Sequence, residues 1–421
     1  MGYQAEIRDS DVIDGLSIRF LKLFGMWRAL NDYRTTGKKS IIIKLHIFGS
    51  LMITVPYVVF QVQSFFTIQF DIQKVTFVNL HPLPALQMCC RMLLFWFHMD
   101  RVCRLYDMIR KDFINIPEYM RDSVRELYIK TNRTFNVTCL VIFIWNAGIE
   151  FIFIVFPKVS VDYVQHHTGS MAAVKTGRKK ILSGWFPCPM DEYPYYEIIY
   201  VYEAFCLLWA ATLLNVYFCM FYQVLMCLYA QFTVLGARLS NLKLDFPDFG
   251  LSKRHKNIIQ NCNYNLYQEL YESLRDHQKL LRYTDDLRKF YNPLVTVTLG
   301  IGILLLFMGA VQILLGKTSD PSFLFQLFQI FSFQFIEVSL FCFGSSRIES
   351  ASTDLQFAIY CSDWYKADVR FRRAAQMLMI RTRKSSTLTA IVMYPVNLET
   401  LGAIVQFTYS TAALMSGMAT N

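Results

Sequence analysis

Long runs of apolar residues alternate with polar segments along the 421-residue chain. A helix needs about 20 apolar residues to cross the ~30 Å hydrocarbon core of a bilayer. The pattern therefore predicts an all-α membrane protein with a span at each run of that length: 41–61, 79–99, 135–157, 197–229, 291–315, 322–343 and 396–417.

The basic residues of the polar segments predict the orientation. Taken alternately, these segments hold 33 Lys and Arg on one side and 7 on the other, and the N-terminal segment belongs to the richer set. The positive-inside rule places the N-terminus in the cytoplasm and the C-terminus outside the cell. This topology counts against a metabotropic receptor of the G-protein-coupled class, which has an external N-terminus. It also places the sequons at Asn132 and Asn136 in the cytoplasm, where we expect no glycan.

Composition supports the membrane interpretation. Hydrophobic residues make up 54% of the chain and charged residues 18%, against about 25% charged residues in ordinary soluble domains. The net charge of +10 comes from the basic loops. We therefore interpret it as a sign of membrane orientation and expect no nucleic-acid partner.

The segments between the spans indicate a domain organisation. Residues 11–30 have the spacing of an amphipathic helix, which either lies on the inner leaflet or packs on the cytoplasmic part of the protein. Residues 256–290 predict a long helix that continues into span five. The predicted divisions are a cytoplasmic N-terminal segment, spans one to four forming the ligand-binding bundle, a cytoplasmic loop and helix, spans five and six, cytoplasmic anchor helices and a last helix: 1–40, 41–245, 246–290, 291–343, 344–395 and 396–421.

The sequence contains no recognised catalytic or metal-binding motif. The vicinal pair His166-His167 lacks the separated ligands that a metal site needs, and Asn292-Pro293 is interpreted as the start of a helix. Neither a catalytic cluster nor the inverted repeats of a transporter are evident. The sequence predicts neither an enzyme nor a cofactor.

Ionisable residues inside the spans are costly and are expected to face the bundle interior in pairs. Arg91 lies near the middle of span two, and Glu150 and Glu337 lie at similar depth, so either could be its partner. Glu203 lies toward the outer end of span four. Structural pairing is the preferred interpretation, and ligand contact is the alternative.

The last span carries no charge after Glu399 and is rich in small and hydroxyl residues. Close helix packing explains such a composition. The other interpretation is a pore-lining helix, with Thr408, Ala412 and Ser416 on one stripe. Because this stripe carries no Lys or Arg, such a pore would admit cations.

The C-terminal quarter carries the motifs Ala358-Ile-Tyr with Trp364, Tyr394-Pro-Val-Asn-Leu-Glu-Thr400 and Phe407-Thr-Tyr-Ser410. In these motifs, and in length, span number and orientation, the chain resembles the insect odorant receptors. Gustatory relatives usually end in a Q-F that is missing here. The shared co-receptor has a long insertion between spans four and five that this chain also lacks. The resemblance therefore favours an odorant-tuned subunit, with a gustatory-type channel or a metabotropic seven-span chemoreceptor as the alternatives.

The resemblance implies a ligand-gated, non-selective cation channel in the plasma membrane of sensory-neuron dendrites. Four subunits, including the co-receptor, would surround a pore lined by the last helix and would be embedded in membrane lipid. A small volatile odorant would bind among the outer halves of spans two, three, four and six. Helix depth and the aromatic or sulfur character of several side chains indicate the expected ligand-binding residues: Met88, Trp145, Gly148, Ile152, Phe205, Trp209, Phe325 and Phe328.

Overall fold

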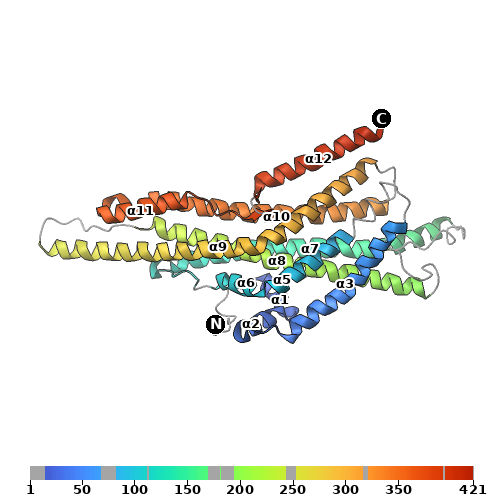
Figure 1. Cartoon of the computed structure of the whole chain (residues 1–421), viewed down its shortest axis with the longest axis horizontal. Coiled ribbons are helices and arrows are strands. Elements are labelled where there is room, and N and C mark those ends of the chain that lie inside the picture. The colour runs from blue at the N-terminus through green and yellow to red at the C-terminus, as the bar shows by residue number, and fades with distance from the viewer. Residues whose placement is uncertain are drawn as a thin grey trace.

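The computed structural model describes residues 15–67, 82–110, 113–168, 181, 194–242, 253–315, 321–391 and 394–420. Each predicted span overlaps a helix (Figure 1). These helices are α3 (Ile41–Thr67), α5 (Pro82–Phe97), α7 (Arg121–Thr168), α8 (Tyr195–Ser240), α9 (Lys253–Leu315), α10 (Pro321–Tyr360) and α12 (Leu398–Thr420). Shorter elements connect them: α1 (Leu16–Leu23), α2 (Met26–Thr36), α6 (Met99–Leu105), η2 (Tyr106–Ile109), η3 (Glu118–Met120), η5 (Trp364–Lys366) and α11 (Val369–Thr382).

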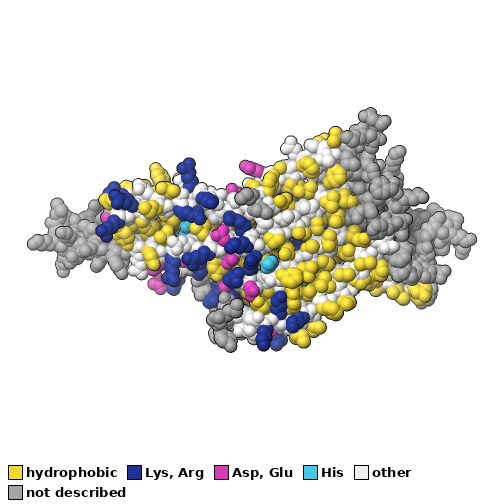
Figure 2. Space-filling model, in the orientation of Figure 1, with side chains coloured by type: hydrophobic (Ala, Val, Ile, Leu, Met, Phe, Trp, Pro, Cys, Tyr) yellow, Lys and Arg dark blue, Asp and Glu magenta, His cyan; other side chains and the backbone are white. Residues whose placement is uncertain are grey.

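Length and composition identify the membrane region. Among the described residues, five helices are long and apolar enough to cross a bilayer: α3, α7, α8, α9 and α10. The apolar helix α5 is shorter, and the predicted span that contains it begins before the described part at Pro82. Figure 2 shows hydrophobic side chains covering one half of the visible face, while Lys and Arg gather on the other half. We call the latter the charged end, formed by the last turn of α8, by α9 before Phe290 and by α11.

Helix α8 forms the centre of the bundle. Every side chain from Leu213 to Leu228 is buried, as expected for a helix that is apolar on all sides. It packs against α10, α7 and α9. Helix α7 differs, since apolar side chains such as Val141 and Ile144 are more than half exposed on the outside of the bundle. The amphipathic or all-round apolar character of each helix thus decides its place in the bundle.

Helix α9 is one continuous element of 63 residues that joins the charged end to the membrane region. The sequence predicted this continuity, but the expected helix start at Asn292-Pro293 is wrong, because Pro293 lies inside the helix. A proline cannot donate to the carbonyl four residues earlier. That carbonyl, of Lys289, accepts instead from Arg101 Nη1 at 3.5 Å. Helices α9 and α10 continue across the predicted divisions at 290 and 343, and the division into membrane and cytoplasmic parts stays a prediction.

The described part of the predicted amphipathic helix 11–30 forms two helices, so the expectation of one helix is wrong. The chain turns at Gly25, whose φ of 69° is left-handed and suits glycine. Helix α1 packs against α8 and α7, and Asn136 Oδ1 accepts from the Leu16 backbone N–H at 2.7 Å. The structure therefore favours packing on the helical bundle. In α2, a hydrogen bond to Asp100 raises the pKa of Tyr33 to about 12.

A small hairpin precedes the last helix. Strands β1 (Thr389–Ala390) and β2 (Tyr394–Pro395) are antiparallel, and Asn292 Nδ2 on α9 donates to Thr389 Oγ1 at 3.2 Å. The hairpin fixes the start of α12 on α9. Beyond it, α12 runs along the upper edge of the bundle in Figure 1.

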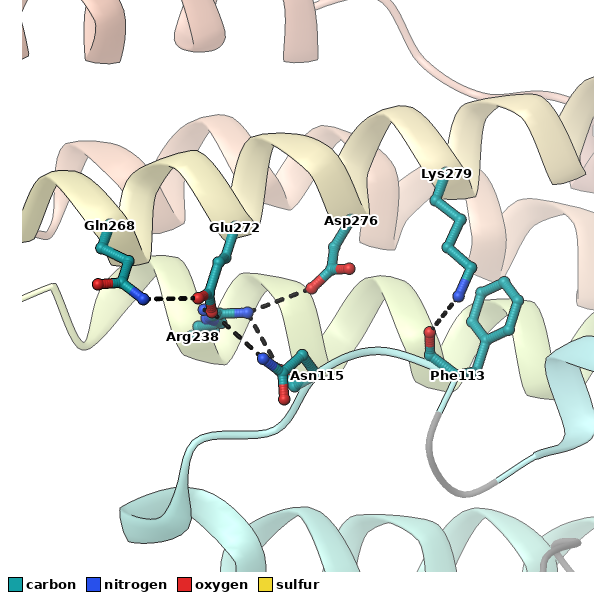
Figure 3. Close-up of polar contacts among 7 residues, drawn as sticks. All are labelled: Phe113, Asn115, Arg238, Gln268, Glu272, Asp276 and Lys279. Atoms are coloured by element: carbon teal, nitrogen blue, oxygen red, sulfur yellow. Dashed lines mark hydrogen bonds and ion pairs between the residues drawn. The ribbon is translucent and has the colours of Figure 1, made fainter.

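At the charged end, the buried Arg238 joins three segments (Figure 3). From the last turn of α8, its guanidinium donates to Glu272 at 2.7 Å and to Asp276 at 3.2 Å, both on α9. It also donates to the backbone carbonyl of Asn115 at 3.0 Å. One cation thus clamps α8, α9 and the segment before η3.

Candidate functional site

A cavity of about 90 Å³ lies among the helices of the membrane region. A single water needs about 10–15 Å³ by the same measure, so the space suits a small organic molecule. Most of the wall is apolar, and α8 contributes more lining residues than any of the other helices involved, which are α3, α5, α7, α9 and α10. The residues that line it are Tyr57, Pro84, Ala85, Asn146, Ile149, Glu150, Cys206, Leu207, Ala210, Ala211, Leu214, Asn215, Leu305, Gln329, Ile330, Phe333 and Gln334.

Small side chains on α8 create this space. Ala210 and Ala211 occupy adjacent positions and line the cavity together with the bulkier Phe333 of α10. Asn146 Nδ2 on α7 donates to Asn215 Oδ1 on α8 at 2.7 Å, and Asn215 Nδ2 donates to the Ala211 carbonyl at 2.9 Å. The amide pair fixes α7 against α8 at one side of the cavity.

The eight residues expected to bind ligand lie on helices that contribute to the cavity, but their side chains are not part of its lining. None of the eight lines the cavity, although α5, α7, α8 and α10 all contribute to it. Six of them are one or two residues from a lining residue: Trp145, Gly148, Ile152, Phe205, Trp209 and Phe328. Met88 and Phe325 are three and four residues away.

The surroundings of these residues differ. Met88 is fully buried in the main apolar core. Trp145 and Phe328, 42% and 53% exposed, form an edge contact on the outer surface with ring centroids 6.3 Å apart. Phe205 and Trp209 stack on each other along α8.

The remaining three also lie outside the lining. Gly148 has no atom near the position of an added Cβ, and Ile152 is 45% exposed. Of these three, Phe325 is the one associated with the lining, because it packs against the apolar cluster that includes the lining residues Tyr57 and Cys206. Ligand contact by the eight residues stays a prediction, since depth and aromatic character do not specify the helix face.

The polar residues of the lining are the sequence feature that could have located the cavity. Asn146 and Glu150 are four residues apart on α7 and therefore share a face, and Gln329 and Gln334 lie on α10. Polar side chains at such depth normally face the bundle interior. Their positions would have indicated the cavity face of both helices.

The buried Arg91 on α5 has a defined partner. It forms an ion pair with Glu337 on α10, and both side chains are at most 2% exposed. Arg91 Nη2 also donates to Thr298 Oγ1 on α9 at 3.1 Å, while Gln87 Nε2 donates to Glu337 Oε2 at 2.9 Å. Of the two candidates that the sequence left open, Glu337 is therefore the partner, whereas Glu150 faces the cavity.

The last helix packs along α9 and α10. Thr408 is buried, and its hydroxyl donates to the Ile404 carbonyl at 2.8 Å. The side chains of Ala412 and Ser416 lie outside those described, so the predicted pore stripe stays a prediction. Large side chains are exposed on more than one side of α12: Val405, Phe407, Tyr409 and Leu414.

A model of the 7tm odorant receptor family matches residues 80–409, which include most of the cavity and the C-terminal motifs. The chain belongs to this odorant receptor family. The match favours the odorant over the gustatory alternative.

Individual relatives agree with the family assignment. Odorant receptor 85b of Drosophila melanogaster is 28% identical over 152 residues, covering 36% of this chain and 38% of that protein. Odorant receptor 85c of the same species is 27% identical over 150 residues, covering 35% and 38%. These alignments span less than half the length of either relative.

Solved structures share the complete fold. The olfactory receptor OR5 from Machilis hrabei in complex with eugenol superposes with a TM-score of 0.73 at 13% identity, covering 96% of this chain and 99% of that receptor. A second OR5 structure gives a TM-score of 0.69 at 14% identity, covering 94% and 97%. This odorant receptor is therefore a helical membrane protein of the OR5 fold.

Proposed function

We propose that this odorant receptor is a subunit of an odorant-gated, non-selective cation channel, tuned by a small volatile ligand and opening together with the co-receptor. The observation that carries the proposal is the mostly apolar cavity among the helices in a member of this family. The matching fold of a receptor solved with eugenol supports a small organic ligand.

The cavity suits recognition by shape. Small ligands gain at most about 1.5 kcal/mol for each non-hydrogen atom, so a volatile molecule must fill its space closely to bind. Ala210 and Ala211 set the available width, and Phe333 provides an aromatic wall. A ligand that fits the open arrangement better than the closed one shifts the population toward the open channel.

The last helix is proposed to form the pore in a tetramer with the co-receptor. Its exposed aromatic residues Phe407 and Tyr409 are unusual for the outside of an isolated subunit, and such apolar surfaces mark contacts with other chains or lipid. Thr408 turns toward its own bundle, so Val405 and Tyr409 are further candidates for the surface that meets the pore or a neighbouring subunit. The N-terminus is proposed to lie in the cytoplasm, and the site of action is proposed to be the dendritic plasma membrane.

The test is odorant-evoked current in cells that express this receptor with and without the co-receptor. We expect cation current only with both subunits, and we expect Ala211→Phe to weaken activation at least about tenfold by filling the cavity. Leu208→Phe is the matched control, because Leu208 lies on α8 but is 46% exposed to the outside.

Surface labelling must accompany both variants. Absence of current toward a broad volatile panel, with the receptor at the cell surface, would contradict the channel proposal. Equal responses of Ala211→Phe and the wild type would contradict the assignment of the cavity as the ligand site.

A further inference from the structure

One part of the cavity wall is polar, and its polar atoms lack partners. Tyr57 and Gln334 are only 5% and 1% exposed. Among the described residues, the Tyr57 hydroxyl, Glu150 Oε2, Gln329 Oε1 and both side-chain amide atoms of Gln334 have no hydrogen-bond partner. Each unsatisfied buried polar atom costs about 1–3 kcal/mol. A ligand that supplies the missing partners would recover part of that cost.

Three of these residues form a connected group, which we call the polar cluster: Tyr57, Glu150 and Gln329. The Gln329 side chain hydrogen-bonds the Glu150 carboxyl group, and Glu150 interacts electrostatically with Tyr57. These residues come from α3, α7 and α10, so they converge from separate helices. Gln334 lies on α10 about 7.5 Å further along the helix axis at 1.5 Å per residue.

Acceptors outnumber donors in this part of the wall. The unpartnered acceptor oxygens are Glu150 Oε2, Gln329 Oε1 and Gln334 Oε1. The donors are the Tyr57 hydroxyl and one amide nitrogen, on Gln334. The surplus favours a ligand that brings an O–H or N–H group.

The charged residues in and near the cavity wall also favour a ligand that brings a hydrogen-bond donor. The described lining contains Glu150 and no Lys, Arg or His, and the nearest basic candidate by depth, Arg91, is paired with Glu337. The buried Glu203 also interacts electrostatically with Tyr57. A buried carboxyl group without a cationic partner is costly when ionised, and an ammonium group in the cavity would be such a partner.

We infer that the polar cluster selects odorants that carry a hydrogen-bond donor, either a hydroxyl group or a protonated amine, with the hydrocarbon part against Ala210, Ala211 and Phe333. Glu150 is the residue that determines this specificity. The inference rests on the proposed function, because it assigns the ligand class of the same cavity.

The experiment compares four probes of equal chain length and nearly equal volume: 1-hexanol, hexylamine, pentyl methyl ether and heptane. Each is applied to the receptor co-expressed with the co-receptor, and the half-maximal concentration for current is measured. We expect the alcohol or the amine to act at least about tenfold more potently than the ether and the alkane, since those two cannot donate.

Variants of Glu150 separate the two kinds of donor. Glu150→Leu should abolish the preference for donors, while Glu150→Gln should keep a preference for hexanol and lose one for hexylamine, because an amide accepts a hydrogen bond but carries no charge. Glu126→Leu is the control, since Glu126 lies on α7 in an exposed position away from the cavity. If Glu150→Leu does not reach the surface, Gln334→Leu takes its place with the same expectation.

Several results would overturn the inference. They are equal potency of all four probes, a donor preference that survives removal of the polar side chain, or silence toward both donors in a receptor that other volatiles activate. Silence toward every volatile would instead count against the proposed channel function itself.

Discussion

Single residues in the membrane region show how buried charge is accommodated. Arg91 and Glu337 neutralise each other, and Thr298 and Gln87 supply further hydrogen bonds. Two buried ions gain from pairing only when such additional partners satisfy them. Glu150, in contrast, faces a cavity without a basic side chain. The same residue type thus has a structural role on α10 and is available for recognition on α7.

We expect either single substitution, Arg91→Met or Glu337→Met, to destabilise the receptor by about 3–5 kcal/mol, because each leaves an uncompensated buried charge. The double variant should recover most of that loss. Thermal stability of the detergent-purified receptor and its surface expression measure the effect. Arg91→Met with wild-type stability would show that the pair is not needed for folding.

Among the elements, long helices connect the charged end to the membrane region. The 63-residue helix α9 passes through both, and α8 reaches the same end with its last turn. A helix of this length is stabilised by packing along its sides more than by its own propensity. At the charged end that packing includes Arg238, which is 1% exposed and contacts Glu272, Asp276 and the chain at Asn115 (Figure 3).

Substitution of Arg238 should weaken the contacts that join α8, α9 and the chain at Asn115. Arg238→Met leaves Glu272 and the buried Asp276 without their cation, so we expect lower thermal stability and less receptor at the surface. Arg238→Lys should be intermediate, because a lysine keeps the charge but cannot contact several acceptors as a planar fork.

The control for this comparison is Arg275→Met on α9, the helix that carries Glu272 and Asp276, since Arg275 is exposed. It should behave like the wild type. An equal loss of thermal stability in Arg275→Met and Arg238→Met would show that the effect comes from the change in net charge and not from the contacts of Arg238.

At the scale of the whole molecule, charge and apolar surface are separated along the long axis (Figure 2). The separation agrees with the 33-to-7 division of Lys and Arg between alternate segments. Asn136, in one of the two sequons, accepts a backbone hydrogen bond from α1, and a glycan on its side chain would disrupt that contact.

We therefore expect a tag at the N-terminus to be inaccessible on intact cells, a tag at the C-terminus to be accessible, and no glycan on Asn132 or Asn136. Immunostaining without permeabilisation and a glycosidase mobility shift measure these outcomes. Thr168→Asn creates a sequon in the segment expected outside the cell and serves as the positive control. A glycan on Asn132 or Asn136 of the wild-type protein would contradict the proposed topology.

The sequence by itself determined the number and order of the spans, the continuity of α9 and the family motifs near the C-terminus. These features are local, because a span requires only a sufficiently long apolar run. The sequence did not reveal the turn at Gly25, since a single glycine within an amphipathic pattern leaves the helical spacing of its neighbours unchanged.

Only the tertiary structure decided which groups meet. Glu150 and Glu337 were equivalent partners for Arg91 by depth, and rotation of α7 and α10 within the bundle made Glu337 the partner. The cavity likewise lies beside Ala210, not beside its aromatic neighbour Trp209. A shift of one residue turns a helix position by about 100°, so the position of a residue along a span cannot specify its contacts until the helices are packed.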